Sequence, residues 1–289
     1  MIKHILLGLM LCGAVNASIY PSLDSIPTGT NSLQYVYAGT NLVWTKQINY
    51  ALIFDGVNDW VEIADAPAYD LTGDFTISTW AKRADEIGLE VMVGKFWDGS
   101  TRGWYFGISS DDLGGTRCRF LHYEASSSTS LHQYNSDTYD FTATNLHYFV
   151  ATHNATAGTY TVYIDGVSSN GAESACAVEI NNAKMTVGEA VHTTLNPFLP
   201  FNGSIGRVFI YNKELTQSEI TTMYEKGMGA SVDVADLVFG VSPVPKDSTI
   251  FSSTYIPTEN SYTDLLNLDD PAMYFGNTGT GDLGIEEIK

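Results

Sequence analysis

From Leu52 onward the sequence alternates short apolar, β-branched runs with glycine-containing dipeptides that favour tight turns. The runs are Leu52–Phe54, Trp60–Ile63, Phe75–Trp80, Glu90–Val93, Trp104–Ile108, Arg117–Tyr123, Leu146–Thr152, Tyr160–Ile164, Met185–Val187 and Ser204–Tyr211. The turn dipeptides between them are Asp55-Gly56, Thr72-Gly73, Asp98-Gly99, Gly114-Gly115, Ala157-Gly158, Asp165-Gly166 and Asn202-Gly203. Because no helical pattern separates the runs, they predict an antiparallel sandwich rather than βαβ units.

One helix is predicted at the end of this region. Thr216 stands three residues before Glu219, which is the spacing of a capping box. Ile220 and Met223 supply an apolar stripe, and Gly227 can adopt the left-handed backbone conformation that ends a helix. The helix is therefore expected to close the domain.

Three stretches carry a resemblance to a known family. Leu52–Ile63 followed by Gly73–Trp80 is similar to the opening of laminin-G-like domains of the concanavalin-A-like lectin/glucanase superfamily. The central hairpin Tyr160–Gly166 and the closing stretch Phe201–Thr216 resemble the same family. The resemblance implies an antiparallel jelly-roll sandwich over residues 51–228. It implies less about function, because this scaffold hosts lectins, adhesion modules, calcium sites and hydrolases.

The leader, residues 18–50, is rich in Ser, Thr and Asn and predicts a hairpin from the runs Leu33–Tyr37 and Leu42–Thr45. Its stretch Gln34–Trp44 resembles short hairpins of tailed-phage virion proteins, which implies a virion origin as an alternative to the cell surface.

The tail, residues 229–289, contains one plausible strand, Asp236–Val241, and several prolines. It predicts a small extra β-layer or an oligomerisation arm. The expected fold class is thus all-β: an antiparallel jelly-roll sandwich with one short C-terminal helix, a small β-rich leader and a small β-rich tail. Leader and tail together could support a homo-oligomer.

Residues 1–17 read as a secretory signal. Lys3 and His4 precede the apolar run Ile5–Val15, and small residues up to Ala17 suit a cleavage site. The run is too short to span a bilayer, so no membrane insertion is expected after signal removal. The chain is predicted to be secreted or surface-displayed, with a retained hydrophobic strand or helix as the alternative.

The formal net charge of −19 argues against nucleic acid and anionic membrane surfaces as partners. The acidity either keeps the protein soluble or supplies carboxylates for calcium. After signal removal Cys118 and Cys176 would remain, which allows one disulfide or two buried free thiols.

No motif for catalysis is present, and a non-enzymatic protein is predicted. A hydrolase of this fold needs two carboxylates on one strand. Glu62 and Asp65 lie in a strand-to-loop segment, and the acids near Glu90 surround a turn. The histidines show no zinc-protease spacing, and His147 and His153 are expected to be half-exposed sheet residues.

Calcium is the predicted cofactor, by resemblance to the family, which holds an ion between the opening loop and the closing strand. Asp55, Asn58 and Asp59 are the candidate ligands, although the closing position that is commonly acidic reads Gly206. The alternative is that the two aspartates only form the turn.

Ligand binding would use aromatic rings, because the apolar face of a sugar stacks on them. Trp97, Tyr134 and Tyr139 occur in loop contexts and are the predicted ligand-binding residues, whereas Trp80 and Trp104 fall in strand patterns and are expected in the core. The predicted function is an adhesion module that binds a glycan or a cell-surface or virion protein. A structural subunit of a virion or surface assembly and an extracellular glycoside hydrolase are the alternatives.

Overall fold

A computed structural model describes residues 35–38, 41–45, 49–84, 88–96, 102–111, 115–124, 127–139, 145–173, 177–190, 198–229, 236–241, 273–277 and 284–288. The chain divides into two compact units, Met1–Ile48 and Asn49–Lys289. In the first unit, β1 (Tyr35–Ala38) pairs antiparallel with β2 (Asn41–Thr45), which confirms the predicted hairpin. Over the described ranges, no helix has the length and apolar character needed to cross a bilayer.

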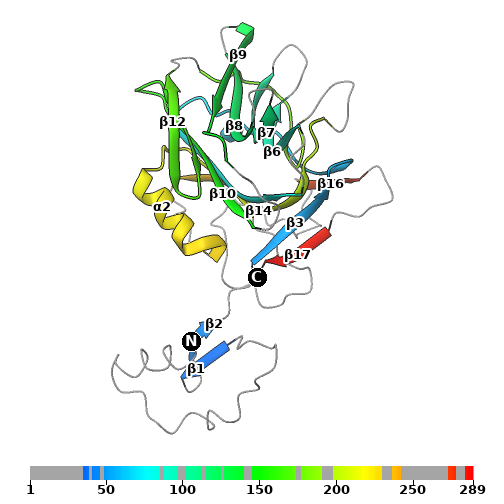
Figure 1. The fold of residues 1–289 in the computed structure, drawn as a ribbon, viewed down its shortest axis with the longest axis vertical. Helices are drawn as coiled ribbons and strands as arrows, with labels where there is room; N and C mark the ends of the chain where they lie inside the picture. The colour runs from blue at the N-terminus through cyan, green and yellow to red at the C-terminus, as the bar shows by residue number, and fades with distance from the viewer. Residues whose placement is uncertain are drawn as a thin grey trace. The chain divides into compact units, whose positions relative to one another are not determined.

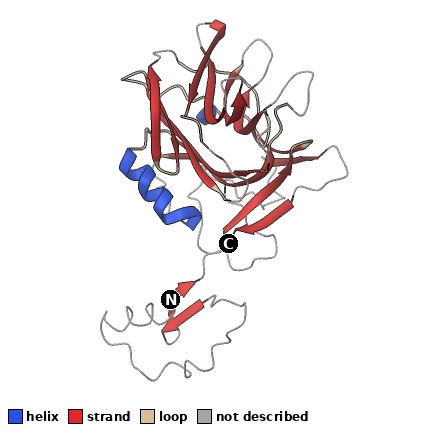
Figure 2. Cartoon of the chain, in the orientation of Figure 1, coloured by secondary structure: helices blue, strands red, loops and turns tan. Residues whose placement is uncertain are grey.

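The second unit is a sandwich of two antiparallel sheets, drawn in red in Figure 2. The eight-stranded sheet runs in the order β12 (Val167–Glu173), β11 (Thr159–Ile164), β10 (His147–Asn154), β5 (Phe75–Arg83), β14 (Asn202–Tyr211), β3 (Asn49–Asp55) and β17 (Gly284–Ile288), with β15 (Leu237–Val241) also paired to β14. The seven-stranded sheet runs in the order β16 (Met273–Asn277), β4 (Asp59–Ile63), β13 (Met185–Val187), β6 (Leu89–Phe96), β7 (Gly103–Asp111), β8 (Gly115–Glu124) and β9 (Ser127–Asn135). The predicted antiparallel sandwich is confirmed.

The main core fills the space between the two sheets. Inward residues of the seven-stranded sheet, such as Val61 and Phe106, meet Ile77, Phe149 and Ile210 of the eight-stranded sheet, and all are almost fully buried. Since successive side chains of a strand point to opposite faces, each strand contributes only alternate residues to this core. The remaining residues face outward and determine what the sandwich can contact.

Helix α2 (Gln217–Lys226) lies on the outer side of the eight-stranded sheet (Figure 1). The predicted capping box is confirmed: the Glu219 N–H donates to the Thr216 hydroxyl, and the Thr216 N–H donates to the Glu219 carboxylate. Trp80 stacks with Tyr148 at 5.0 Å and with Tyr224 of the helix at 5.9 Å. Trp80 is therefore an anchor for the helix.

The described strands of the tail join the two sheets of the sandwich. The tail strands β15, β16 and β17 pair with β14, β4 and β3 of the sandwich. The predicted strand at 236–241 is confirmed as β15. Without the other two tail strands, β3 and β4 would present unpaired backbone groups at sheet edges, which the tail pairing satisfies.

Within the region 51–228, the strands β9 and β12 were not expected from the sequence. Each lies at the end of its sheet and has only one neighbour. Their sequences are rich in Ser, Thr, Asn and Gly, because an edge strand faces more water and needs fewer apolar side chains. The apolar alternation that reveals central strands is correspondingly weak in them.

One end of the core holds stacked aromatic and imidazole rings. The Tyr160 ring stacks on Tyr134 and on His153, each at 4.1 Å between centroids, and on His122 at 5.0 Å. The expectation that His153 is half-exposed is wrong, since it is 4% exposed, whereas His147 is half-buried. Desolvation lowers the pKa of His122 to about 4 and also lowers the pKa of His153.

Cys118 is a free thiol that is fully buried in the same core. Burial raises its pKa well above the ordinary value, which keeps the thiol protonated and unreactive. The sequence allowed either a disulfide or buried free thiols, and Cys118 is a buried free thiol. Cys176 lies outside the described residues.

The buried His122 predicts loss of stability in acid. In the unfolded chain its pKa returns to about 6.5, so the unfolded state binds the proton more readily than the folded state between about pH 6.5 and 4. The free energy of unfolding should fall by about 3 kcal/mol across this window from His122 alone. Urea unfolding at several pH values should show a smaller fall in the free energy of unfolding for His122→Phe than for the wild type. Part of the fall that remains in the variant should come from His153. Equal falls in both proteins would contradict the prediction.

Candidate functional site

The outer faces of the two sheets differ in how they are covered. On the eight-stranded sheet, α2 and the residues around Leu215 and Leu237 bury an outer apolar cluster. On the seven-stranded sheet, the outward residues Tyr105 and Leu121 are also buried, because they pack in a cluster with Phe198 and Leu199 of the segment before β14. The part of the outer face formed by β8 and β9 is more open.

Polar and aromatic side chains gather on this open part. Arg117, Arg119 and Tyr123 point outward from β8, alternating with the core residues Cys118 and Phe120. Residues from β9 and the residue just before β7 complete the surface. We call it the β8–β9 face, and it consists of Arg102, Arg117, Arg119, Tyr123, Gln133 and Asn135, each half-exposed or exposed.

Short contacts hold the arginines of this face in place. Arg119 Nε donates to Asn135 Oδ1 at 2.8 Å, and Arg117 Nη1 donates to the Ser136 carbonyl at 2.9 Å. Burial raises the pKa of Tyr105 to about 12, and the Arg119 guanidinium beside its hydroxyl opposes this rise.

Arg102 lies against Tyr123. Its guanidinium carbon is 4.7 Å from the centre of the Tyr123 ring, and Nη1 donates to the Tyr123 hydroxyl at 2.9 Å. The backbone N–H of Arg102 donates to the Glu179 carboxylate at 2.8 Å. The cation and the ring therefore form one positioned pair at one end of the face.

The three aromatic residues predicted to bind a ligand are not brought together. Trp97 lies outside the described residues. The predicted loop placement of Tyr134 is wrong, because it belongs to β9, is 4% exposed and stacks within the core, so its ring offers no open face. The alternation of β9 turns Tyr134 inward and leaves its neighbours Gln133 and Asn135 outward.

Tyr139 is exposed in an irregular segment, as expected. Its hydroxyl donates to Asp165 Oδ2 at 3.1 Å, and His147 Nδ1 lies 2.7 Å from the same oxygen. Desolvation opposes a lowering of the Asp165 pKa, but hydrogen bonds from His147 and the Tyr148 N–H outweigh it and the pKa is lowered. A role of Tyr139 in ligand binding stays a prediction.

The candidate calcium ligands form a turn. Asp55 Oδ1 accepts the N–H groups of Val57 and Asn58 at 2.8 and 3.1 Å, and Asp59 Oδ2 accepts the Asp55 N–H at 3.0 Å. The β14 residue paired with Asp55 is Asn202.

The closing position Gly206 faces another region. A Cβ added there would lie 2.5 Å from the Met228 side chain, so a larger residue does not fit without movement. In the described part of the chain no three His, Cys, Asp or Glu side chains cluster as metal ligands. Calcium at the turn remains a prediction that rests on two carboxylates and an amide.

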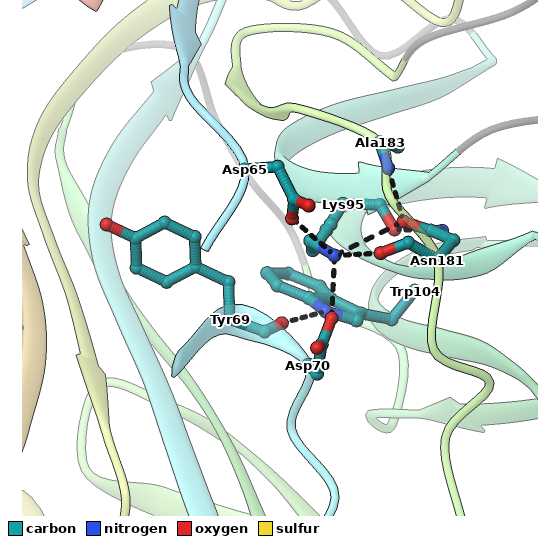
Figure 3. Close-up of polar contacts among 7 residues, drawn as sticks. All are labelled: Asp65, Tyr69, Asp70, Lys95, Trp104, Asn181 and Ala183. Atoms are coloured by element: carbon teal, nitrogen blue, oxygen red, sulfur yellow. Dashed lines mark hydrogen bonds and ion pairs between the residues drawn. The ribbon is translucent and has the colours of Figure 1, made fainter. Parts of the chain in front are cut away.

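A buried lysine was missed by the sequence analysis (Figure 3). Lys95 is 1% exposed, and its Nζ lies 2.9 Å from Asp65 Oδ1 and 2.6 Å from Asp70 Oδ1. The ammonium also donates to the backbone carbonyl of Asn181. The only sequence signal was a lysine in the apolar run that forms β6. With Asn181 Oδ1 at 3.4 Å, four oxygens surround the ammonium and connect the segment after β4 and the segment before β13 to this strand.

Trp104 supports the same cluster, and its expected core position is confirmed. The side chain is 1% exposed, and its indole N–H donates to the Tyr69 carbonyl at 3.0 Å. This hydrogen bond fixes the short 3-10 helix Pro67–Tyr69 just before Asp70. The Lys95 cluster therefore has a structural role: it connects β6 to the segments that contain Asp65, Asp70 and Asn181.

Glu189 and Glu62 are two carboxylates close enough for their charges to interact. Desolvation, with a smaller contribution from the charge of Glu62, raises the pKa of Glu189 to about 8. Glu189 is 1% exposed, however, and Glu62 pairs with Lys184. A substrate could not touch Glu189 in this arrangement, so the geometry does not favour hydrolysis at this pair.

The comparisons with known proteins agree with this fold. A family model described as the concanavalin A-like lectin/glucanases superfamily matches residues 55–221, which is more than half of the chain. The chain therefore belongs to that superfamily. No curated protein matches it in sequence.

Several solved structures are similar. A candidate carbohydrate-binding protein from Bacteroides ovatus has a TM-score of 0.52 at 14% identity, covering 74% of this chain and 57% of that one. A heptameric SAP-like pentraxin from Limulus polyphemus has a TM-score of 0.48 at 10% identity, covering 60% and 81%. The CBM40 domain of a Ruminococcus gnavus sialidase, bound to α2,3-sialyllactose, has a TM-score of 0.47 at 12% identity, covering 59% and 95%.

The Lys95 cluster generates a stability prediction. Lys95→Met should lower the free energy of unfolding by roughly 3–5 kcal/mol, because Asp65 and Asp70 would lose the cation between them. Lys184→Met is the matched control: it removes an ion pair with Glu62 in which Lys184 is well exposed, and should cost about 1 kcal/mol or less. Urea unfolding at pH 7 measures the loss of stability in both variants. Similar losses would show that the Lys95 cluster does not stabilise the fold more than an exposed ion pair does.

The calcium prediction has a direct test. An ion that binds only the folded protein raises its melting temperature as the ion concentration rises above the dissociation constant. The wild type should melt at a higher temperature in calcium than in chelator, and Asp59→Ala should abolish the difference. Identical melting curves for the wild type would leave Asp55 and Asp59 as turn residues.

Proposed function

We propose that the sandwich is a non-enzymatic carbohydrate-binding module and that the β8–β9 face is its ligand-binding surface. The observation that carries this proposal is the set of half-exposed outward residues Arg117, Arg119 and Tyr123 on β8, beside Gln133 and Asn135 on β9. A sugar needs a ring for its apolar face and a few fixed polar groups for its hydroxyls.

The face meets both needs on a rigid support. Tyr123 provides a ring, and the Arg102 guanidinium above it adds N–H donors. Gln133 and Asn135 add amide groups that can donate and accept. Because these side chains project from paired strands, they are positioned before the ligand arrives, which lowers the entropy lost on binding.

The superfamily covers lectins and glucanases, so membership supports a carbohydrate ligand but does not separate binding from hydrolysis. The burial of Glu189 favours binding. The Bacteroides ovatus protein of the same fold, itself a candidate carbohydrate-binding protein, fits the proposal.

We place this module at a cell surface or on a virion, where it would act in adhesion. The proposal rests on the sequence of the predicted signal and leader. The leader hairpin belongs to a unit of its own, as expected of a segment that attaches a displayed domain to an assembly. A purely structural subunit would share this feature, and ligand binding separates the two functions.

The test of the proposed function compares two tyrosines. The full chain should bind one or more oligosaccharides on an array of neutral and acidic glycans. For such a sugar, isothermal titration should show at least tenfold weaker binding by Tyr123→Ala, since stacking and hydrogen bonds to the ring edge are lost. Tyr139→Ala, which changes the other described tyrosine predicted to bind a ligand, should bind as the wild type does if Tyr123 rather than Tyr139 contacts the sugar. Loss of binding in Tyr139→Ala alone would show that the site lies at Tyr139 and not on the β8–β9 face. Absence of binding to every glycan on the array would overturn the proposed function.

A further inference from the structure

The charge of the β8–β9 face is opposite to that of the whole protein. The chain carries 14 Lys and Arg against 33 Asp and Glu, and it contains five arginines. Three of the five, Arg102, Arg117 and Arg119, lie on this one face. Such a concentration of guanidinium groups is not needed for solubility, which the net charge of −19 already provides.

From this distribution we infer that the ligand is an anionic sugar, one that carries a carboxylate or sulfate group and is held by the arginines of the β8–β9 face. The inference rests on the proposed function, since it names the ligand class of the same site.

The side-chain contacts of Arg102 and Arg117 leave their charge available. The hydrogen bonds of Arg102 and Arg117 side chains within the described residues end on neutral oxygens, the Tyr123 hydroxyl and the Ser136 carbonyl. Neutral partners fix the orientation of a guanidinium without cancelling its charge. Arg83 shows the contrast: it is buried and its Nε pairs with the Glu90 carboxylate at 2.9 Å, as a structural arginine does.

Two carboxylates among the described residues near the face contact groups other than an arginine side chain. Glu179 is 9% exposed and accepts the backbone N–H of Arg102. Glu124 lies 3.6 Å from His132. Neither contact neutralises the side-chain charge of Arg102 or Arg117.

The arginines are also spaced for an extended ligand. Arg117, Arg119 and Tyr123 share one side of β8 with the buried Leu121, and Arg117 and Tyr123 are six positions apart, or about 20 Å. Arg102 is carried to the far end by its contact with Tyr123. Cations therefore stand at both ends of the row, and the ring of Tyr123 lies against Arg102 at one end.

The chemistry of guanidinium groups suits this ligand class. Planar N–H donors match the paired oxygens of a carboxylate or sulfate, and the charged hydrogen bonds that form are about twice as strong as neutral ones. Because the protein as a whole repels anions, only a ligand that makes these short contacts would bind.

Matched probes test the inference. Trigalacturonic acid and its methyl ester form the carboxylate pair, and a carrageenan tetrasaccharide and its desulfated form are the sulfate pair. Titration of the full chain should show at least tenfold tighter binding of the charged member of one pair, and the pair that shows it identifies the anion.

Substitutions locate the effect. Arg102→Gln and Arg117→Gln should each weaken binding of the charged probe about tenfold and reduce its advantage over the neutral probe. Lys226→Gln, which removes the same charge from the exposed end of α2, should change neither affinity. A fall of the same size in Lys226→Gln would mean that net charge, rather than this face, sets the preference.

The outcomes separate the two proposals. Binding of neutral sugars on the array without tighter binding of either charged probe would overturn the anionic ligand and leave the binding module standing. Absence of binding to every neutral and acidic glycan would overturn both. Circular dichroism of each variant shows whether the sandwich is still folded.

Discussion

The register of β8 between its neighbours is the constraint on which both the core and the candidate site depend. Cys118 pairs with Ile108 of β7, and Arg119 pairs with Gly107 and with Asn135 of β9. A shift by one residue would turn Arg119 into the core and expose Phe120. The buried apolar face therefore holds the register, and the register in turn places the arginines on the opposite face. In this sandwich the same strand register sets which side chains stabilise the core and which side chains form the surface.

The seven-stranded sheet also contains buried polar groups that an apolar core would not need. The Lys95 ammonium is satisfied by oxygens from two segments, while Glu189 stays protonated near neutral pH because burial disfavours its charge. His122 is neutral for the same reason. Removing one partner from such a group is costly, since the other is left in a medium that cannot solvate it. The loops that connect the strands are thus tied by specific contacts as well as by burial.

The two outer faces illustrate how one fold can separate structure from recognition. Helix α2 and the stacked rings of Trp80 and Tyr148 cover one sheet. On the other sheet, Phe198 and Leu199 cover Tyr105 and Leu121, whereas the arginines of β8 stay accessible. The surface left uncovered is the one where cationic groups gather on an otherwise acidic protein. Superfamily membership alone does not show this, because the same scaffold carries many functions.

The sequence by itself determined the fold class, the central strands and the helix cap, because these depend on local signals: the alternation of apolar residues, glycine turns and the spacing of Thr216 and Glu219. It also placed Trp104 in the core. It missed the edge strands β9 and β12 and so placed Tyr134 in a loop, since an edge strand lacks a strong apolar pattern. Only the tertiary structure decided that Lys95 meets Asp65, Asp70 and Asn181, that the tail strands pair with β3 and β4, and that Arg102 reaches Tyr123. These contacts join residues far apart in the chain, and no local pattern specifies which distant groups the packing of two sheets will bring together.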